Sequence, residues 1–247
     1  LYFHLLTESR EIDGVVLLAM DCVYIAGIAR PDLTTLYISN EFLGKEIEKI
    51  NDRFRKMGSP KRFFLGASIH PGRVDWRKEL SRAIELGAVL IKWIPSVQKI
   101  DPAAVSPDFY RALADADIPL LSHTGVEHTL PVLPAKDQSL NDLQRLRTPL
   151  DSGVRIIAAH CNAHLNDLRI AGLKLHREFN YNGHLDLLEF LREANRTALR
   201  MVADTSALTA TQGERRRVLQ EIAGSRSIEG PDSAAHFPEQ FLIHGSD

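Results

Sequence analysis

The sequence predicts an α/β protein built as a (β/α)8 barrel. Short, nearly continuous apolar runs alternate along the chain with amphipathic helical stretches. Runs of this kind are typical of strands that are buried on both faces of a parallel sheet. An open, doubly wound sheet would show the same alternation. However, no glycine-rich phosphate loop follows any of the runs, which weighs against a nucleotide-binding sheet.

Seven apolar runs are expected to be strands. They are residues 14–20, 62–70, 88–93, 118–123, 154–160, 199–205 and 241–247. Residues 1–12 have the pattern of a helix, and a helix there implies a strand before residue 1. Because eight strands close a barrel, we expect a single barrel domain over residues 1–247, with strand 1 and the last helix missing from this sequence.

Helices are expected in the gaps, where apolar residues recur at steps of three and four. This spacing occurs over residues 43–57, 76–84 and 140–150. Gly87 follows the second of these stretches and is expected to end that helix. Residues 161–198 contain two further helical stretches, which could form part of a cap over the barrel mouth.

The composition excludes several classes of protein. The 247 residues are 44% hydrophobic and 25% charged, with a formal net charge of −2, so bulk electrostatics favour neither a nucleic-acid nor a membrane partner. Cys22 and Cys161 are too few for a disulfide framework, which favours a reducing cytoplasm. No apolar stretch approaches the roughly 18–20 residues that span a bilayer. We expect a cytoplasmic protein that acts on a small-molecule substrate, and we allow for a homodimer.

Polar residues stand at the carboxyl ends of the expected strands, where barrel enzymes place their active sites. These ends carry Asp21, His70, Lys92, His123, His160, Thr205 and Asp247. Because side chains alternate faces along a strand, His160 should share its face with Ala158, and Asp247 with Ile243. If these faces point inward, Lys92, His123, His160 and Asp247 converge on the barrel mouth.

Each of these residues alone has a structural explanation. A strand-end histidine is often hydrogen-bonded within the core, Lys92 could carry its charge to solvent on an apolar stem, and Asp247 could cap a following helix. Four such groups in one place are costly to bury without partners. A metal ion satisfies imidazoles and a carboxylate together, so the pattern favours a metal site.

Four segments carry a resemblance to a known family. They are GAVLIKWIP (87–95), IPLLSHTG (118–125), GVRIIAAHC (153–161) and FLIHGSD (241–247). Their order resembles the amidohydrolase superfamily, especially its branch of decarboxylases and lactonases related to aminocarboxymuconate semialdehyde decarboxylase. By position, the resemblance implies that His123 and Asp247 are metal ligands and that His160 binds a second metal or acts on the substrate. It also implies that Lys92 is a metal-bridging lysine if it is carboxylated, or otherwise an ammonium group that supports the substrate.

The chain departs from the family pattern in two places. The family takes two metal ligands from a His-x-His on strand 1, and no His-x-His occurs in these 247 residues; the only early histidine is His4. His244 also stands where the family more often has an aromatic or aliphatic residue. A first strand that lies outside this sequence would account for the missing motif, whereas its absence from the whole protein would favour a metal-free barrel.

The resemblance implies a metal-dependent hydrolase with a divalent ion, expected to be zinc, that acts on an amide, a lactone or a related carbonyl compound. Asp247 would hold the ion and move the proton of the attacking water. His160 would stabilise the charge that develops on the carbonyl oxygen, and Lys92 would counter a substrate carboxylate. A non-oxidative decarboxylase with the same ligands stays open, as does a metal-free barrel that acts as a binding or scaffold protein.

Four other residues are candidates for substrate contacts. Thr124, Glu127 and His128 follow His123 in a loop punctuated by glycine and proline, and His70 ends the expected second strand in the sequence. Loops at this end of a barrel often carry binding residues, although an exposed loop or a structural histidine would fit the pattern equally well.

Overall fold

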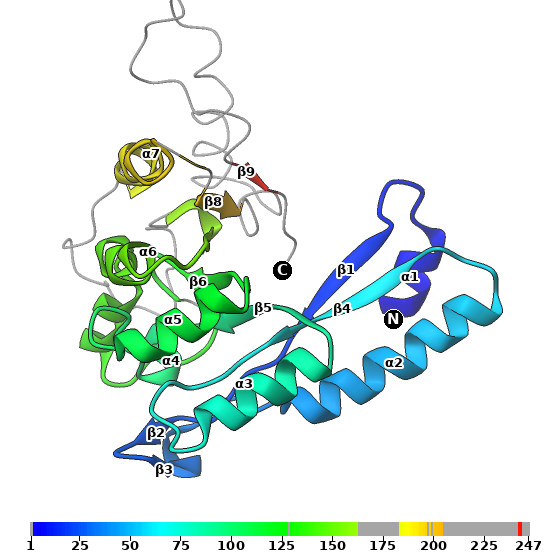
Figure 1. The fold of residues 1–247 in the computed structure, drawn as a ribbon, viewed down its shortest axis with the longest axis horizontal. Coiled ribbons are helices and arrows are strands. Elements are labelled where there is room, and N and C mark those ends of the chain that lie inside the picture. Colours follow the sequence, from blue (N-terminus) through cyan, green and yellow to red (C-terminus); the bar gives the residue numbers. More distant parts are fainter. Residues whose placement is uncertain are drawn as a thin grey trace, which may run out of the picture.

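The computed structural model describes residues 2–127, 129–162, 183–196, 198, 200–204 and 242–243. Its main sheet has seven parallel strands in the order β1-β4-β5-β6-β7-β8-β9, and it curls as it proceeds (Figure 1). The strands are β1 (Gly14–Leu18), β4 (Arg62–Ala67), β5 (Ala88–Trp93), β6 (Leu120–His123), β7 (Ile156–Ala159), β8 (Met201–Asp204) and β9 (Leu242–Ile243). This order follows the chain without reversal, as in a (β/α)8 barrel and unlike a doubly wound sheet, so the predicted fold class is confirmed.

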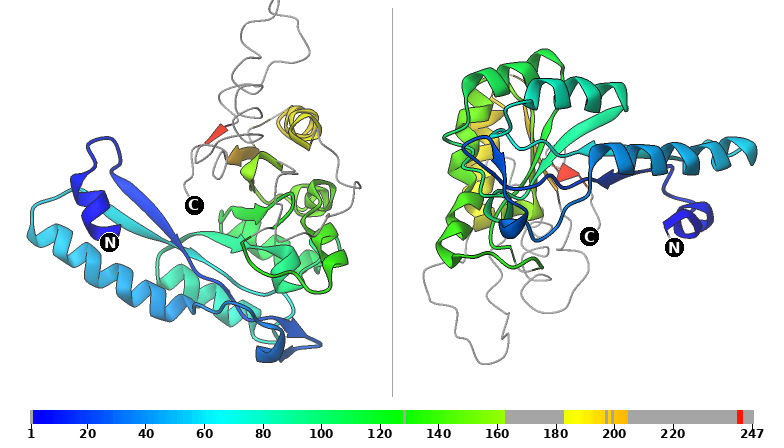
Figure 2. Two further views of the ribbon diagram at one scale, coloured as in Figure 1. Left: turned by 180° about the vertical axis from the view of Figure 1, so that it is seen from behind. Right: turned by 90° about the horizontal axis from the view of Figure 1, so that it is seen from below.

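Helices occupy most of the connections between these strands. They are α1 (Tyr2–Glu8), α2 (Asn40–Lys56), α3 (Trp76–Glu85), α4 (Pro95–Gln98), α5 (Pro107–Asp115), α6 (Arg147–Asp151) and α7 (Gly183–Ala194), with 3-10 segments η1 (Pro31–Leu33), η2 (Ala135–Asn141) and η3 (Leu143–Leu146). Figure 2 (left) shows α2 and α3 nearly end to end, and Arg82 near the end of α3 pairs with Glu41 at the start of α2 at 2.6 Å. The helices predicted near residues 43–57 and 76–84 are confirmed, and Gly87 adopts the left-handed φ of 78° that ends α3.

The helix predicted over residues 140–150 is not continuous. Asp142 has an extended backbone and caps η3 by accepting a hydrogen bond from the Gln144 N–H, and a separate short α6 follows. Pro149 lies inside α6 and has no N–H to bond to the Arg145 carbonyl, which accounts for the change from the 3-10 segment η3 to α6. The leucine spacing therefore predicts helical structure correctly, but this structure is divided between η2, η3 and α6.

Two elements were not expected from the sequence. The first is α5, which starts at Pro107 after Ser106 accepts a hydrogen bond from the Asp108 N–H. Serine followed by proline is a common helix start, so this signal was readable. The second is a hairpin of β2 (Tyr24–Ile25) and β3 (Ile28–Ala29), whose turn residues Ala26 and Gly27 have φ values of 50° and 82°. Two positive φ values are the geometry of a tight hairpin turn.

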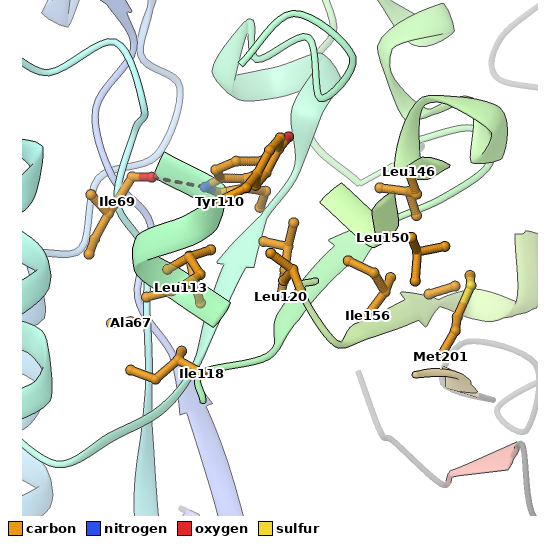
Figure 3. Close-up of a cluster of buried hydrophobic side chains, with 14 of the residues drawn as sticks. Ala67, Ile69, Tyr110, Leu113, Ile118, Leu120, Leu146, Leu150, Ile156 and Met201 are labelled. Carbon is orange, nitrogen blue, oxygen red and sulfur yellow. Dashed lines mark hydrogen bonds between the residues drawn. The ribbon is translucent and has the colours of Figure 1, made fainter. Parts of the chain in front are cut away.

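The core lies between the sheet and the helices. Alternate strand residues point toward it, and Ile91, Leu120, Ile156 and Met201 are register partners across four neighbouring strands. Figure 3 shows Leu120, Ile156 and Met201 in this layer together with Leu113 of α5 and Leu146 of η3. Trp93 adds an aromatic contact to Phe109 with 5.5 Å between ring centroids, and its indole N–H donates to the Ile69 carbonyl.

Helix α2 holds strand β4 through two asparagine side chains. The Asn51 amide exchanges hydrogen bonds with the Phe63 N–H and C=O, at 2.8 and 2.9 Å. The Asn40 amide does the same with the Ser68 N–H and C=O just beyond the strand, at 2.8 and 3.0 Å. Asn40 and Ser68 are both buried, so these backbone groups have no access to bulk water. The two asparagines therefore fix the helix along the length of the strand.

We predict that Asn40→Ala lowers the free energy of unfolding by about 2–4 kcal/mol, because it leaves two buried backbone groups of Ser68 without their partner. Urea unfolding followed by circular dichroism would measure the loss. Lys45→Ala, on the exposed face of the same helix, should leave the midpoint nearly unchanged. Equal effects of the two substitutions would contradict this account of α2.

Candidate functional site

The carboxyl ends of β5, β6 and β7 bring three of the predicted residues to one region. Lys92 is the register partner of Leu121, and His123 lies two residues further along the same face of β6. We call this face the inner face, since it is opposite to the face that packs on the helices. Lys92 and His123 are each 6% exposed, whereas Leu121 is half-buried. A charged group and an imidazole are therefore held together at the end of the sheet where barrel active sites lie.

His160 reaches this region through a turn. The expectation that it continues the alternation of Ala158 is wrong, because Ala158 faces the helix-side core and β7 ends at Ala159. His160, Cys161 and Asn162 then have φ values of 62°, 50° and 52°. Three consecutive non-glycine residues in the left-handed region each cost roughly 1 kcal/mol or more, so other contacts must hold the turn.

The two histidines meet as a result of this turn. The ring centroids of His123 and His160 are 4.6 Å apart, and the planes are inclined by 61°. The register explains the approach, because His123 is paired with Ala159, the residue directly before His160. The structure thus brings His123 and His160 together, and it places Lys92 on the neighbouring strand of the same face.

Thr124 holds the turn that carries His160. Its hydroxyl donates to the Ala159 carbonyl at 2.6 Å and accepts from the Asn162 N–H at 3.1 Å, and the residue is 1% exposed. The hydroxyl therefore bridges the residues on both sides of the strained segment. In this structure Thr124 makes protein contacts that position His160, and its predicted contact with a substrate stays a prediction.

Cys161 anchors the same turn from its other side. Its thiol donates to the Asp204 carbonyl at 3.4 Å, and burial raises the pKa of this thiol to about 12. A thiol with so high a pKa stays protonated at neutral pH and is a poor nucleophile. Cys161 is therefore a packing residue, and the chemistry of the turn rests on His160.

Two buried carboxylates lie in this region. Glu127, predicted only as a loop residue that could contact a substrate, has one carboxylate oxygen 3.4 Å from Nδ1 of His123. Asp204 ends β8 and is 6% exposed, whereas the sequence predicts that strand end at Thr205. Nothing in the sequence shows that the loop turns Glu127 back toward His123.

His70 uses both ring nitrogens on the protein. Nε2 is 2.9 Å from the Gln98 carbonyl oxygen, and Nδ1 accepts from the Gly72 N–H at 2.9 Å, so Nε2 carries the proton. Burial lowers the pKa of His70 to about 4. Asp21, another strand-end residue, accepts from the His70 N–H at 2.8 Å and pairs with Arg73. In this conformation both strand ends serve to join β1 to β4, and a substrate contact of His70 stays a prediction.

The remaining predicted residues, His128 and Asp247, lie outside the described residues, as do His244 and Thr205. Over the part of the chain that the structure describes, no group of three or more histidine, cysteine, aspartate or glutamate side chains could hold a metal ion. The imidazoles of His123 and His160 are two suitable zinc donors, and a complete site needs further ligands. Among the described helices, none has both the length and the apolar composition needed to cross a bilayer.

Comparisons with known proteins support the fold. No protein-family model matches the sequence, and no curated protein matches it. One similar solved structure is described as a probable 2-pyrone-4,6-dicarboxylic acid hydrolase from Acinetobacter baumannii with citric acid bound, at a TM-score of 0.52 and 15% identity. The match covers 100% of this chain and 72% of that one. A Pseudomonas putida protein with the same provisional description has a TM-score of 0.48 and 15% identity, over 84% of this chain and 64% of that one.

We predict that His70 makes the fold sensitive to acid. Its folded pKa of about 4 lies below the unfolded value of about 6.5, so the unfolded chain binds more protons between these values. Stability should therefore be complete above pH 6.5 and fall as the pH drops toward 4, by about 2 kcal/mol at pH 5. Urea unfolding at pH 7 and pH 5 would measure the loss. In His70→Asn this loss of stability between pH 7 and pH 5 should vanish. An unchanged pH dependence in the variant would show that His70 is not its cause.

We predict that Thr124→Val, which keeps the shape of the side chain, destabilises the fold by about 1–3 kcal/mol because the Asn162 N–H and the Ala159 carbonyl lose their shared partner. Thr124→Ser keeps the hydroxyl and should lose less than half as much. Thermal unfolding of both variants would test this. A larger loss in Thr124→Ser than in Thr124→Val would show that the methyl group, and not the hydroxyl, holds the turn.

Proposed function

We propose that the chain is a hydrolase of the amidohydrolase type whose catalytic centre lies at the carboxyl ends of the barrel strands. The observation that carries the proposal is the contact between His123 and His160, whose ring centroids are 4.6 Å apart at the ends of β6 and β7. The strained turn at His160 supports it further, because strain of this kind clusters at functional sites. The proposed reaction is attack of water on a lactone, an amide or a related carbonyl group.

Each residue of this site has a proposed task. His160 faces the carbonyl oxygen of the substrate and donates a hydrogen bond to it as negative charge develops. Lys92, buried on the inner face, offers an ammonium group to a carboxylate of the substrate. Asp247 takes the proton of the attacking water and returns it to the leaving group. The groups would thus bind the two ends of an acidic carbonyl compound.

We further propose a divalent metal ion, with zinc as the first candidate, held by His123 and Asp247; His160 would bind a second ion where there is one, in place of its role on the substrate. The two imidazoles of the described residues suit zinc, which prefers nitrogen and sulfur donors and accepts carboxylates. When bound, such an ion lowers the pKa of its water to about 7 and so supplies hydroxide at neutral pH. Carboxylation of Lys92 would permit a second ion, whereas the ammonium form suits the substrate role given above.

The description of the Acinetobacter baumannii neighbour suggests a first substrate to assay. A 2-pyrone-4,6-dicarboxylate is a cyclic ester that carries two carboxylates, the kind of compound that Lys92 and His160 would bind together. Because the two chains share 15% identity, their similarity supports the barrel, and the choice of substrate rests on the residues of this site.

We predict that the chain hydrolyses 2-pyrone-4,6-dicarboxylate or a related lactone, and that His160→Asn lowers kcat/KM at least 100-fold through loss of its hydrogen bond to the developing oxyanion. Loss of the pyrone ultraviolet absorbance would measure the rate, in chain purified without chelator and again with added zinc. Asp142→Asn, an exposed carboxylate that caps η3, is the control and should keep full activity.

Two outcomes would contradict this proposal. Release of carbon dioxide from an intact ring would identify a decarboxylase. A chain that binds the compound without turnover, with and without zinc, would identify a binding protein. Wild-type activity in His160→Asn would remove the role assigned to that residue.

A further inference from the structure

Glu127 is a buried carboxylate to which the proposed reaction gives no task. Its side chain is 4% exposed, and one of its carboxylate oxygens lies 3.4 Å from Nδ1 of His123. Burying a carboxylate is costly unless several groups pair with it. The contacts that offset this cost show what the side chain is built to do.

The Glu127 backbone is fixed by one side-chain amide. Gln138, in η2, accepts a hydrogen bond from the Glu127 N–H at 3.0 Å and donates one to the Glu127 carbonyl at 2.9 Å. The paired contacts hold the peptide in one orientation. Gln138 therefore fixes the Glu127 backbone from outside the turn that Thr129 and Leu130 form.

The carboxylate itself divides its two oxygens between different partners. Oε1 accepts from the Thr129 and Leu130 N–H groups, the latter at 2.9 Å, and so closes the turn that follows. Oε2 is the oxygen that faces His123. Because Oε1 is held by two donors, the side chain cannot rotate away from the imidazole without losing both.

We propose that Glu127 is a positioning residue that sets the tautomer and the orientation of His123. A carboxylate accepts hydrogen bonds and donates none when ionised, so it favours the proton on Nδ1 and leaves the lone pair on Nε2. Outer carboxylates of this kind orient histidines that bind metals or substrates. This inference rests on the proposed hydrolase site, in which His123 would bind the metal ion; with the proton on Nδ1, Nε2 is the nitrogen that can do so.

The variant Glu127→Gln separates this role from a purely structural one. Its amide oxygen can still accept from the Thr129 and Leu130 N–H groups, so the turn keeps its cap. Its NH2 group would then face Nδ1 of His123 and donate to it, which favours the proton on Nε2. The substitution should therefore reverse the tautomer and leave the fold intact.

The experiment is 15N NMR of the histidine rings above the pH at which they are neutral, with His123→Gln used to assign the resonances. We expect the Nδ1–H tautomer of His123 in the wild type and a shift toward Nε2–H in Glu127→Gln. We also expect the affinity for zinc, measured by competition with a chelator, to fall about 10- to 100-fold in that variant. Asp142→Asn, which removes a carboxylate that caps η3, should change neither quantity.

The outcomes keep the two proposals apart. An unchanged His123 tautomer in Glu127→Gln overturns the positioning role, whether or not the chain hydrolyses a lactone. A reversed tautomer with unchanged zinc affinity in a zinc-binding wild type also overturns it, because the orientation would then have no consequence at the site. If the wild type neither binds zinc nor turns over a substrate, the proposed function fails, and a reversed tautomer still supports the contact between Glu127 and His123.

Discussion

The site depends on one hydroxyl group. Thr124 bridges the Ala159 carbonyl and the Asn162 N–H, and between these two groups lie His160 and Cys161, two of the three consecutive left-handed residues. The bridge helps to offset a strain of several kcal/mol in this turn. With it, His160 leaves the line of its strand and its ring meets that of His123. A polar contact between two strand ends thus determines which side chains share the barrel mouth.

The surrounding residues support His123 and His160 separately. Thr124 and Cys161 hold the turn that presents His160, while Glu127, fixed by Gln138, faces His123. Each imidazole is therefore oriented by a different segment that is itself hydrogen-bonded. Catalytic groups need such support, because small displacements from the productive geometry are costly in rate. The arrangement fits the preorganised site that we propose.

The sequence predicts the sheet well and the site in part. Continuous apolar runs identify strands, and their order along the chain implies the order in the barrel, so the strands that carry His123 and His160 are expected to be neighbours, whereas their register is not. The change from η3 to α6 was readable from Pro149, since proline carries a known cost inside a helix. The turn at His160 was not, because His-Cys-Asn contains no glycine to signal a left-handed backbone. The contact between Glu127 and His123 was not readable for a similar reason: it depends on the path of a loop, and no periodicity encodes it.

In the proposed reaction, an acidic carbonyl compound binds between His160 and Lys92 and is hydrolysed there. A crystal structure of the Asp247→Asn variant with 2-pyrone-4,6-dicarboxylate tests this most directly, since that variant should bind the compound without consuming it. We expect a carboxylate of the ligand to lie within hydrogen-bonding distance of Nζ of Lys92. We expect the ring carbonyl oxygen of the ligand to lie at the imidazole of His160. A ligand bound away from these two residues, at the amino ends of the strands or outside the barrel, would contradict it.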